Sequence, residues 1–242
     1  MSIQDFGPSK VRISAIILNW NAAQDTIRCI QNIHNWSHLQ TEIWVVDNAS
    51  TDNSADVIKR TCPDVYWVQN KINLGFGGGN NRGLEQVLAH SDAPILLLNN
   101  DAIIAEQDML LLVDALENQP QLGCIGPLLF DRAHPNKLIS AGGRDISRYI
   151  QTHITQIVSA PLQSVDYVPG TVILLRAKIL REIGLFDETY FFSGETADLC
   201  ERMRQKGYTC AVDTRAHALH EQHIELDRIE ALRTYYLSLI HI

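Results

Sequence analysis

The alternation of short apolar runs with helix-like segments constrains the fold of this chain more than any other feature of its sequence. In the first half, runs rich in Ile, Leu and Val precede segments in which apolar side chains recur at helical spacing. Strands that alternate with helices form βαβ units and hence a mainly parallel sheet. The pattern predicts strands at 12–18, 42–47, 65–69 and 95–98, and helices at 24–35 and 79–90.

The pattern changes after about residue 124, where shorter runs are interrupted by Pro and Gly. Such interruptions indicate a mixed or antiparallel extension of the sheet. We therefore expect one α/β domain over 11–220, in which helices flank a mainly parallel central sheet. A C-terminal helical tail over 221–242 ends without a capping signal, and we interpret it as truncated. Strands are predicted at 126–130, 138–142 and 165–169, and helices at 177–183 and 195–206.

The charge balance excludes one large class of partner. The 242 residues include 20 Lys and Arg against 28 Asp and Glu, which gives a net charge of −8. Nucleic-acid-binding domains carry a basic patch or stripe, so a nucleic-acid partner is not expected. An anionic ligand would instead need a bound metal ion or backbone N–H groups.

Cysteine spacing and hydropathy bear on the compartment. The cysteines are scattered without a C-x-x-C pair, which implies neither a disulfide framework nor a zinc site and fits a reducing cytoplasm. Residues 1–10 lack a signal-peptide pattern, and the apolar runs at 95–98 and 172–175 are too short to cross a bilayer. We expect a soluble, cytoplasmic protein, and peripheral contact with the inner face of a membrane stays open. The five cysteines are Cys29, Cys62, Cys124, Cys200 and Cys210.

Polar clusters at 19–21, 47–48 and 99–101 follow three of the predicted strands. In open α/β sheets, ligands bind beyond the carboxyl ends of the strands, so these clusters indicate a ligand site. For Asp47, which closes an apolar strand, we favour contact with a ligand such as a nucleobase or ribose. Ser50 or Asp52 can cap a helix that begins near residue 53, and for Asp52 capping and ligand contact stay open.

The glycine-rich segment 73–83 (NLGFGGGNNRG) fits no frame of the dinucleotide fingerprint G-x-G-x-x-G. We interpret it as a flexible backbone that leads into a helix N-terminus and suits close approach of an anion. The alternative is a plain glycine-rich loop. Asn80, Asn81 and Arg82 favour ligand contact.

Further acidic positions carry candidate chemistry. Asp101 follows the apolar run at 95–98, and diphosphates commonly bind through Mg²⁺ or Mn²⁺ held by one or two carboxylates. The alternative for Asp101 is an Asx turn. Glu195 and Asp198 share one face at a helix start, beside aromatic residues at 190–192 that can stack on a sugar. They serve either as a general base or as acids that complement the helix dipole, and both interpretations stay open.

Taken in order, these motifs resemble those of the inverting family-2 glycosyltransferases, and within them the rhamnosyltransferase-like branch that builds cell-surface polysaccharides. The resemblance implies a GT-A fold, with a nucleotide-sugar-binding half at 11–123 and an acceptor half at 124–220. The implied donor is a nucleoside-diphosphate sugar, with dTDP- and UDP-linked sugars as candidates. The implied acceptor is a hydroxyl of a glycan or a lipid-linked molecule. The motifs are NxN at 19–21, VDNASTD at 46–52, NLGFGGGNNxG at 73–83, LLNND at 97–101, GLFDE at 184–188 and ExxDLCxR at 195–202.

The resemblance also implies roles for residues. Asp47 matches the residue that reads the nucleobase, with Asn19 and Asn81 near the nucleotide. Asp101 matches the last carboxylate of the family's D-x-D-like metal motif, and His220 resembles the late His that completes the metal or phosphate site. Mg²⁺ or Mn²⁺ is the implied cofactor. With the strand-end and loop positions added, the predicted donor-nucleotide residues are Asn19, Asn21, Asp47, Asn48, Ser50, Asp52, Asn73, Gly75, Asn80, Asn81, Asn99 and Asn100.

Two positions depart from the family pattern. The first carboxylate of the D-x-D-like motif is the amide Asn99 here, and the acceptor motif also differs. The acceptor motif of the family commonly reads Glu-Asp-x-Asp with its second residue as the base, but Thr196 stands there in this chain. Because Thr cannot act as a base near neutral pH, we expect Glu195 as the base, with Asp198 second, or an inactive chain.

Two alternatives to a glycosyltransferase remain. Thr196 supports a non-catalytic subunit that binds nucleotide sugars. A nucleotidyltransferase would have a related fold, although residues 19–22 lack the Gly and basic residues that such enzymes carry after their first strand. The sequence predicts neither the donor sugar, the acceptor linkage nor the oligomeric state.

Overall fold

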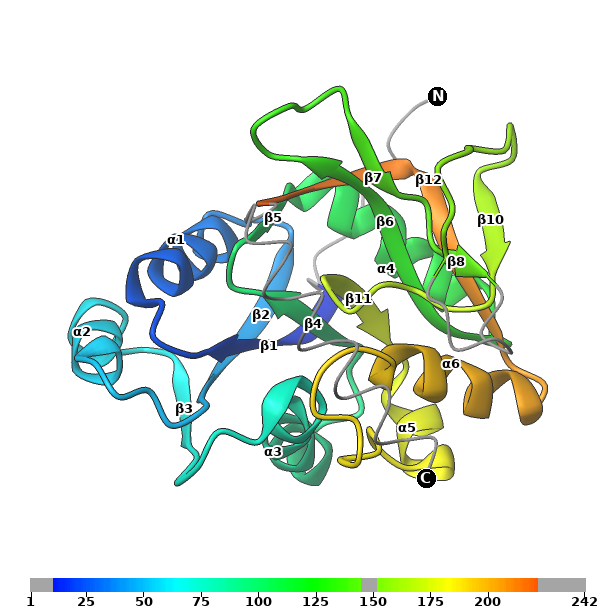
Figure 1. Ribbon diagram of the computed structural model, residues 1–242. Helices are drawn as coiled ribbons and strands as arrows, with labels where there is room; N and C mark the ends of the chain where they lie inside the picture. Colours follow the sequence, from blue (N-terminus) through cyan, green and yellow to red (C-terminus); the bar gives the residue numbers. More distant parts are fainter. Residues whose placement is uncertain (1–10, 145–151, 222–242) are drawn as a thin grey trace.

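A large mixed sheet runs through the part of the chain that the computed structural model describes, residues 11–144 and 152–221 (Figure 1). Its strand order is β10-β12-β6-β11-β4-β1-β2-β3, with β5 paired to β12 and β7 paired to β6. A second, two-stranded sheet consists of β8 (Gly143–Arg144) and β9 (Thr152–His153).

The first half forms the parallel part of the sheet, as predicted. β1 pairs in parallel with β2 and β4, and β2 pairs in parallel with β3. The carboxyl ends of these strands therefore meet at one edge, where the predicted polar clusters lie. The elements are β1 (Val11–Asn19), α1 (Ala23–His34), β2 (Leu39–Asp47), α2 (Ser54–Thr61), β3 (Tyr66–Gln69), α3 (Gly75–His90) and β4 (Ile95–Asn99).

The second half forms the mixed extension that the Pro and Gly interruptions predicted. β11 is antiparallel to both β4 and β6, whereas β12 runs parallel to β6. Helix α4 and strand β12 were not predicted from the sequence. The elements are β5 (Ala102–Ile104), α4 (Glu106–Asn118), β6 (Leu122–Asp131), β7 (Leu138–Ser140), β10 (Leu162–Val165), β11 (Val172–Leu175), α5 (Ala177–Ile183), α6 (Glu195–Gln205) and β12 (Thr209–His220).

The predicted strand at 165–169 is wrong. The strand in this region is β10, which ends at Val165, and the residues after it form a loop. The backbone N–H groups of Asp166 and Tyr167 donate to the Gly143 carbonyl rather than to β12, so the ladder with β12 ends at Val165. The loop carries Tyr167 and Pro169 to the wall of the pocket described below.

Two apolar layers, one on each face of the sheet, form the core. Alternate residues of β1 enter opposite layers: Ile13 and Ile17 pack with α1, α2 and α4, whereas Ile16 packs with α3, α5 and α6. This alternation follows from the two-residue period of a strand. Burial on both faces explains why the central strands are continuously apolar.

No helix in the described ranges is long and apolar enough to span a membrane. The predicted helical tail lies, apart from Glu221, outside the described residues.

Candidate active site

Asp47 lies at the carboxyl end of β2, next to Asn19 at the end of β1. Its fully buried carboxylate accepts hydrogen bonds from Asn19 Nδ2 at 2.7 Å and from Gln69 Nε2 at 2.6 Å, and from the Oγ and backbone N–H of Ser50 at 2.6 and 3.0 Å. These contacts join the ends of three strands. The structure thus gives Asp47 a positioning role, and its contact with a nucleobase remains a prediction.

A chain of side-chain hydrogen bonds extends from Asp47 toward the predicted metal motif. Asn19 Oδ1 accepts from Thr26 Oγ1 at 2.7 Å, and Thr26 Oγ1 accepts from Asn100 Nδ2 at 3.1 Å. Two sequence-predicted clusters, at 47–48 and 99–101, are therefore connected through α1. Thr26 was not singled out in the sequence, because a helical Thr beside apolar residues gives no distinctive signal.

The loop after β2 is held by local polar contacts. Asn21, with a φ of 51°, accepts the N–H of Thr51 through Oδ1 at 2.8 Å. Asp52 accepts the N–H of Ser54 at the start of α2 at 2.9 Å, and hydrogen bonding by Ser54 lowers the pKa of Asp52. Asp52 thus holds the first residue of α2, but the N-cap of this helix is Asn53, without a side-chain cap. Ligand contact by Asp52 stays a prediction.

Asn48 uses its amide to hold the entry into α3. Its Nδ2 donates to Asn73 Oδ1 at 2.8 Å and to the Gly75 carbonyl at 3.0 Å. Its Oδ1 accepts from Asn70 Nδ2 and from the Leu74 N–H, both at 3.0 Å. The buried Asn48 side chain therefore fixes the backbone that leads into the helix.

The glycine-rich segment is helix rather than flexible loop, which corrects the interpretation from the sequence. α3 begins at Gly75, four residues earlier than predicted, and its glycines pack against neighbouring elements. A Cβ on Gly75 would lie 2.1 Å from the Phe191 carbonyl oxygen, and one on Gly79 would lie 2.6 Å from Leu18 Cδ1. The glycines are needed because backbone and side chains approach the helix too closely for a Cβ.

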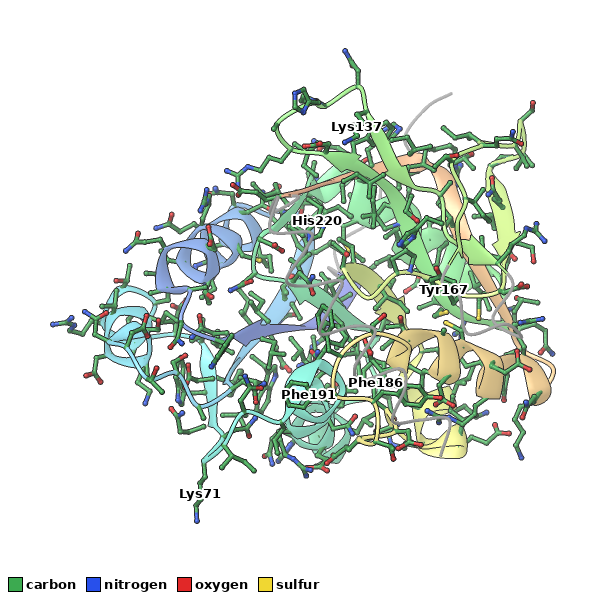
Figure 2. The ribbon with its side chains drawn as sticks, viewed as in Figure 1. Lys71, Lys137, Tyr167, Phe186, Phe191 and His220 are labelled. Atoms are coloured by element: carbon green, nitrogen blue, oxygen red, sulfur yellow. The ribbon has the colours of Figure 1, made fainter. Side chains whose placement is uncertain are left out.

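Residues 186–191 cover the first turns of α3 (Figure 2). Asn81 Nδ2 donates to the Phe186 carbonyl at 2.9 Å, and its Oδ1 accepts the Phe186 N–H at 3.0 Å. The Phe76 N–H donates to the Phe191 carbonyl at 3.0 Å. The neighbouring Asn80 donates to the Phe76 carbonyl. Both predicted donor-binding asparagines therefore bond to the chain itself, and nucleotide contact by either stays a prediction.

Asp101 and His220 come together, as the sequence predicted for a metal site. β12 pairs with β5 so that His220 faces Ala102 in register, which places its Nε2 3.3 Å from Asp101 Oδ1. The two side chains are 21% and 17% exposed. Together they would offer one carboxylate oxygen and one imidazole nitrogen to a divalent cation, whose remaining ligands would be phosphate oxygens and water.

A pocket of about 260 Å³ is lined by both Asn99 and Glu195. Glu195 is 7% exposed, and burial raises the pKa of its carboxyl from 4.5 to about 7. Its Oε2 has no hydrogen-bond partner within the described ranges. The remaining lining residues are Phe76, His153, Tyr167, Pro169, Gly170, Thr171, Phe192, Ser193 and Thr196.

Asp198, the second candidate base, has a different environment. Its Oδ2 accepts from Arg202 Nε at 2.8 Å, and it is not among the residues that line the pocket. Arg202 also donates to the carbonyls of Ile183 and Leu185. Asp198 thus helps to join α6 to the preceding segment, and the pocket favours Glu195 as the base.

His153 and Tyr167 were missed at the sequence level. They reach the pocket from β9 and from the loop after β10, and their rings lie 6.3 Å apart. Figure 2 shows Tyr167 on the side of the molecule that carries β8 and α6. No local motif marks either residue, because the pairing of distant segments brings them together.

Comparison with curated proteins gives distant relatives among sugar transferases. The chain is 24% identical over 236 residues to the low-salt glycan biosynthesis hexosyltransferase Agl10 of Haloferax volcanii, covering 93% of this chain and 72% of that protein. It is 25% identical over 203 residues to the N-acetylglucosaminyl-diphospho-decaprenol L-rhamnosyltransferase of Mycobacterium tuberculosis, covering 74% and 66%. The chain thus spans about two thirds of the second relative.

Solved structures confirm the fold. GalNAc-T7 with UDP, GalNAc and Mn²⁺ superposes with a TM-score of 0.72 at 17% identity, over 89% of this chain and 44% of that one. The mannosyltransferase PcManGT of Pyrobaculum calidifontis, in complex with GDP-Man and Mn²⁺, gives 0.68 at 16% identity, over 93% and 61%. The family model for glycosyl transferase family 2 matches residues 14–184. This chain therefore belongs to glycosyl transferase family 2.

Proposed function

We propose that this chain moves a hexose-type sugar from a nucleoside-diphosphate sugar to an acceptor hydroxyl, with inversion, in the synthesis of a cell-surface glycan. The observation that carries the proposal is the pocket shared by Asn99 and Glu195. Asn99 belongs to the predicted metal motif at 99–101, so one cavity brings a candidate base together with a residue of the predicted donor site.

Glu195 acts as the general base. A pKa of about 7 leaves a large fraction of the carboxyl ionised at neutral pH and keeps it basic enough to accept a proton. As the acceptor oxygen bonds to the anomeric carbon, its proton passes to Glu195. The bond from that carbon to the diphosphate breaks, and the diphosphate leaves with the electron pair. A single displacement of this kind inverts the anomeric centre.

Asp101 and His220 would hold the Mg²⁺ or Mn²⁺ ion, which neutralises charge on the departing diphosphate when bound. The chain orients this pair through two contacts: β12 pairs with β5 beside His220, and the Asn100–Thr26 hydrogen bond fixes the neighbour of Asp101. Both structural neighbours contain Mn²⁺, which supports the assignment.

The aromatic side chains of Phe76, Tyr167 and Phe192 suit a sugar ring, because their faces pack against its C–H groups. For the acceptor we propose a lipid-linked glycan, since the mycobacterial relative is named for a decaprenol-linked substrate. For the donor we propose a UDP- or dTDP-linked sugar. Such an acceptor would place the protein at the cytoplasmic face of a membrane.

Thr196 supports a second candidate, a non-catalytic subunit that binds nucleotide sugars. This candidate predicts donor binding without turnover. The Glu195 environment favours the enzyme. Within the described residues the buried Oε2 of Glu195 has no hydrogen-bond partner, and burying such a group lowers the stability of the fold. A pocket with a purely structural role would not need this carboxyl. Family membership argues against a nucleotidyltransferase.

The experiment is a thermal-shift panel of nucleotide sugars with and without Mn²⁺, followed by an assay of nucleoside diphosphate release. A bound donor raises the melting temperature by mass action. The enzyme predicts that at least one stabilising donor is also turned over, to water when no acceptor is present. Binding without any turnover would support the subunit instead, and no stabilisation by any donor would overturn both.

A further inference from the structure

Cys124, Cys200 and Cys210 form a buried group of sulfur atoms that the proposed transfer chemistry does not use. They come from β6, α6 and β12, and their Sγ atoms all lie within 4.8 Å of one another. The Sγ atoms of Cys124 and Cys200 are 3.7 Å apart. Each residue is at most 1% exposed, and all three are free cysteines. We refer to Cys124, Cys200 and Cys210 as the thiol triad.

No sequence pattern indicates the thiol triad. Cys124 and Cys200 are 76 positions apart, and Cys200 and Cys210 are 10 apart, which fits no metal-binding spacing. The parallel pairing of β6 with β12 puts Cys124 and Cys210 in register, and α6 packs Cys200 against them. We propose that the thiol triad binds one soft monovalent cation, Cu⁺, through its three sulfur atoms.

The distances suit a three-coordinate site. A metal–sulfur bond of about 2.3 Å places two sulfur atoms of a trigonal site about 4 Å apart. The separations in the thiol triad, 3.7 Å for one pair and no more than 4.8 Å for the others, bracket this value. Small side-chain rotations would therefore complete the coordination without movement of the backbone.

The ligand set selects among metals. Thiolate sulfur favours Cu⁺ and Zn²⁺ over hard cations. Structural Zn²⁺ is almost always four-coordinate, but among the His, Cys, Asp and Glu side chains of the described residues the group contains these three alone. Apolar side chains such as Leu199, Met203 and Val212 belong to the same core layer, so water does not readily supply a fourth ligand. A cation that accepts three sulfur ligands fits this site better than Zn²⁺.

Burial of all three side chains favours an ion of low charge. One Cu⁺ neutralises one thiolate, which avoids an uncompensated charge in the apolar core. Any further thiol proton that the metal displaces is released to solvent.

The test is anaerobic titration with Cu⁺ and, separately, with Zn²⁺, followed by gel filtration and metal analysis. The double variant Cys29→Ala/Cys62→Ala is the main sample, because the thiol triad then supplies its only thiols. We expect about one retained Cu⁺ per chain, little retained Zn²⁺, and an X-ray absorption spectrum with three sulfur neighbours at about 2.3 Å.

Two results would overturn the proposal: no retained copper in the folded double variant, or copper with fewer than three sulfur neighbours. Either would show that the thiol triad is only apolar core packing. Adding Cys200→Ala to the double variant should abolish retention and the rise in melting temperature caused by Cu⁺, with circular dichroism reporting whether this variant is folded. Undiminished copper in a folded Cys200→Ala protein would also contradict the site.

Discussion

The carboxyl of Glu195 is both buried and ionisable, so the stability of the folded protein depends on pH. Burial raises its pKa from 4.5 to about 7, so the folded state binds this proton more tightly than the unfolded chain does. Stability from this group is therefore present at low pH and is lost as the pH rises from about 4.5 through about 7. Glu195→Gln removes the titration, and relative to wild type it should gain about 2 kcal/mol between pH 5 and pH 8.

Urea unfolding of both proteins at several pH values measures this gain. Glu117→Gln, on the exposed side of α4, is the matched control and should give no comparable change. A constant difference between Glu195→Gln and wild type across this pH range would contradict a raised pKa at Glu195.

Asp101 permits a prediction about the metal. Asp101→Asn removes a carboxylate from the pair with His220, so Mn²⁺-dependent binding of UDP should weaken by at least about tenfold. Binding of UDP measured without metal should differ little between Asp101→Asn and wild type. Isothermal titration calorimetry of UDP with and without Mn²⁺ gives both values, and Asp92→Asn on the exposed surface is the control. Equal Mn²⁺ dependence in Asp101→Asn and wild type would remove Asp101 from the metal site.

At the residue level, the structure brings some of the predicted site residues together, whereas the partners of others were not predictable from the sequence. Asp101 and His220 were predicted as a pair, and they lie within 3.3 Å. Glu195 and Asp198 could not be separated, because their spacing puts both on one helix face and the Arg202 contact depends on the tertiary structure. Asn48 was predicted to bind the donor, but its side chain bonds to the chain itself. The sequence pattern of a polar residue at a strand end is the same in both cases, so it does not distinguish them.

At the level of elements, α3 depends on glycine for its packing. A Cβ on Gly83 would lie 2.8 Å from Ile16 Cγ2 and 3.0 Å from Val46 Cγ2. Gly83→Ala should therefore destabilise the protein by about 1–3 kcal/mol through overpacking, although Ala is the better helix former. Chemical denaturation of Gly83→Ala measures the loss.

Ala89 provides the matched control, because it lies on the exposed side of the same helix. Ala89→Gly should cost about 1 kcal/mol or less from helix propensity alone. Stabilisation by Gly83→Ala would show that the glycines are not required for close packing.

The contact between α3 and residues 184–188 gives a second prediction at this scale. Asn81→Asp would place a carboxylate against the Phe186 carbonyl and Glu188, where Asn81 now donates. We expect a loss of about 2 kcal/mol or more, since a buried donor is replaced by a charge. Asn136→Asp, in an exposed loop, should change stability by less than about 0.5 kcal/mol. Similar thermal unfolding of the two variants would contradict this role of Asn81.

The error over α3 shows the limit of local sequence patterns. A run of glycines has low helix propensity, so the sequence favoured a flexible loop before residue 79. In the structure, close contacts with Leu18 and Phe191 override that preference. The parallel strands of the first half were predictable because each is a continuous apolar run bounded by polar residues.

At the scale of the whole molecule, the sheet is continuous across the two functional halves proposed from the sequence. β11 from the second half lies between β4 and β6, so the halves share both apolar layers. This placement depends on long-range pairing that no local pattern encodes. It predicts that the chain unfolds in one cooperative transition rather than as two separate units.

The distribution of tryptophan makes this prediction measurable. All four tryptophans, Trp20, Trp36, Trp44 and Trp67, lie in the first half of the chain, so their fluorescence reports that half, whereas far-ultraviolet circular dichroism reports the whole. Urea unfolding curves from the two signals should coincide. A fluorescence midpoint that is clearly separated from the circular dichroism midpoint would contradict a single cooperative unit.

The central claim is that this fold places Glu195 as the base of a sugar transfer. Its most direct test is the rate of nucleoside diphosphate release from a bound donor in Glu195→Gln and Asp198→Asn proteins. Loss of a general base lowers the rate by about 10²–10⁴-fold, and we expect this loss in Glu195→Gln with donor binding retained. Asp198→Asn should keep activity within about tenfold of wild type. Full activity in Glu195→Gln together with its loss in Asp198→Asn would contradict the account.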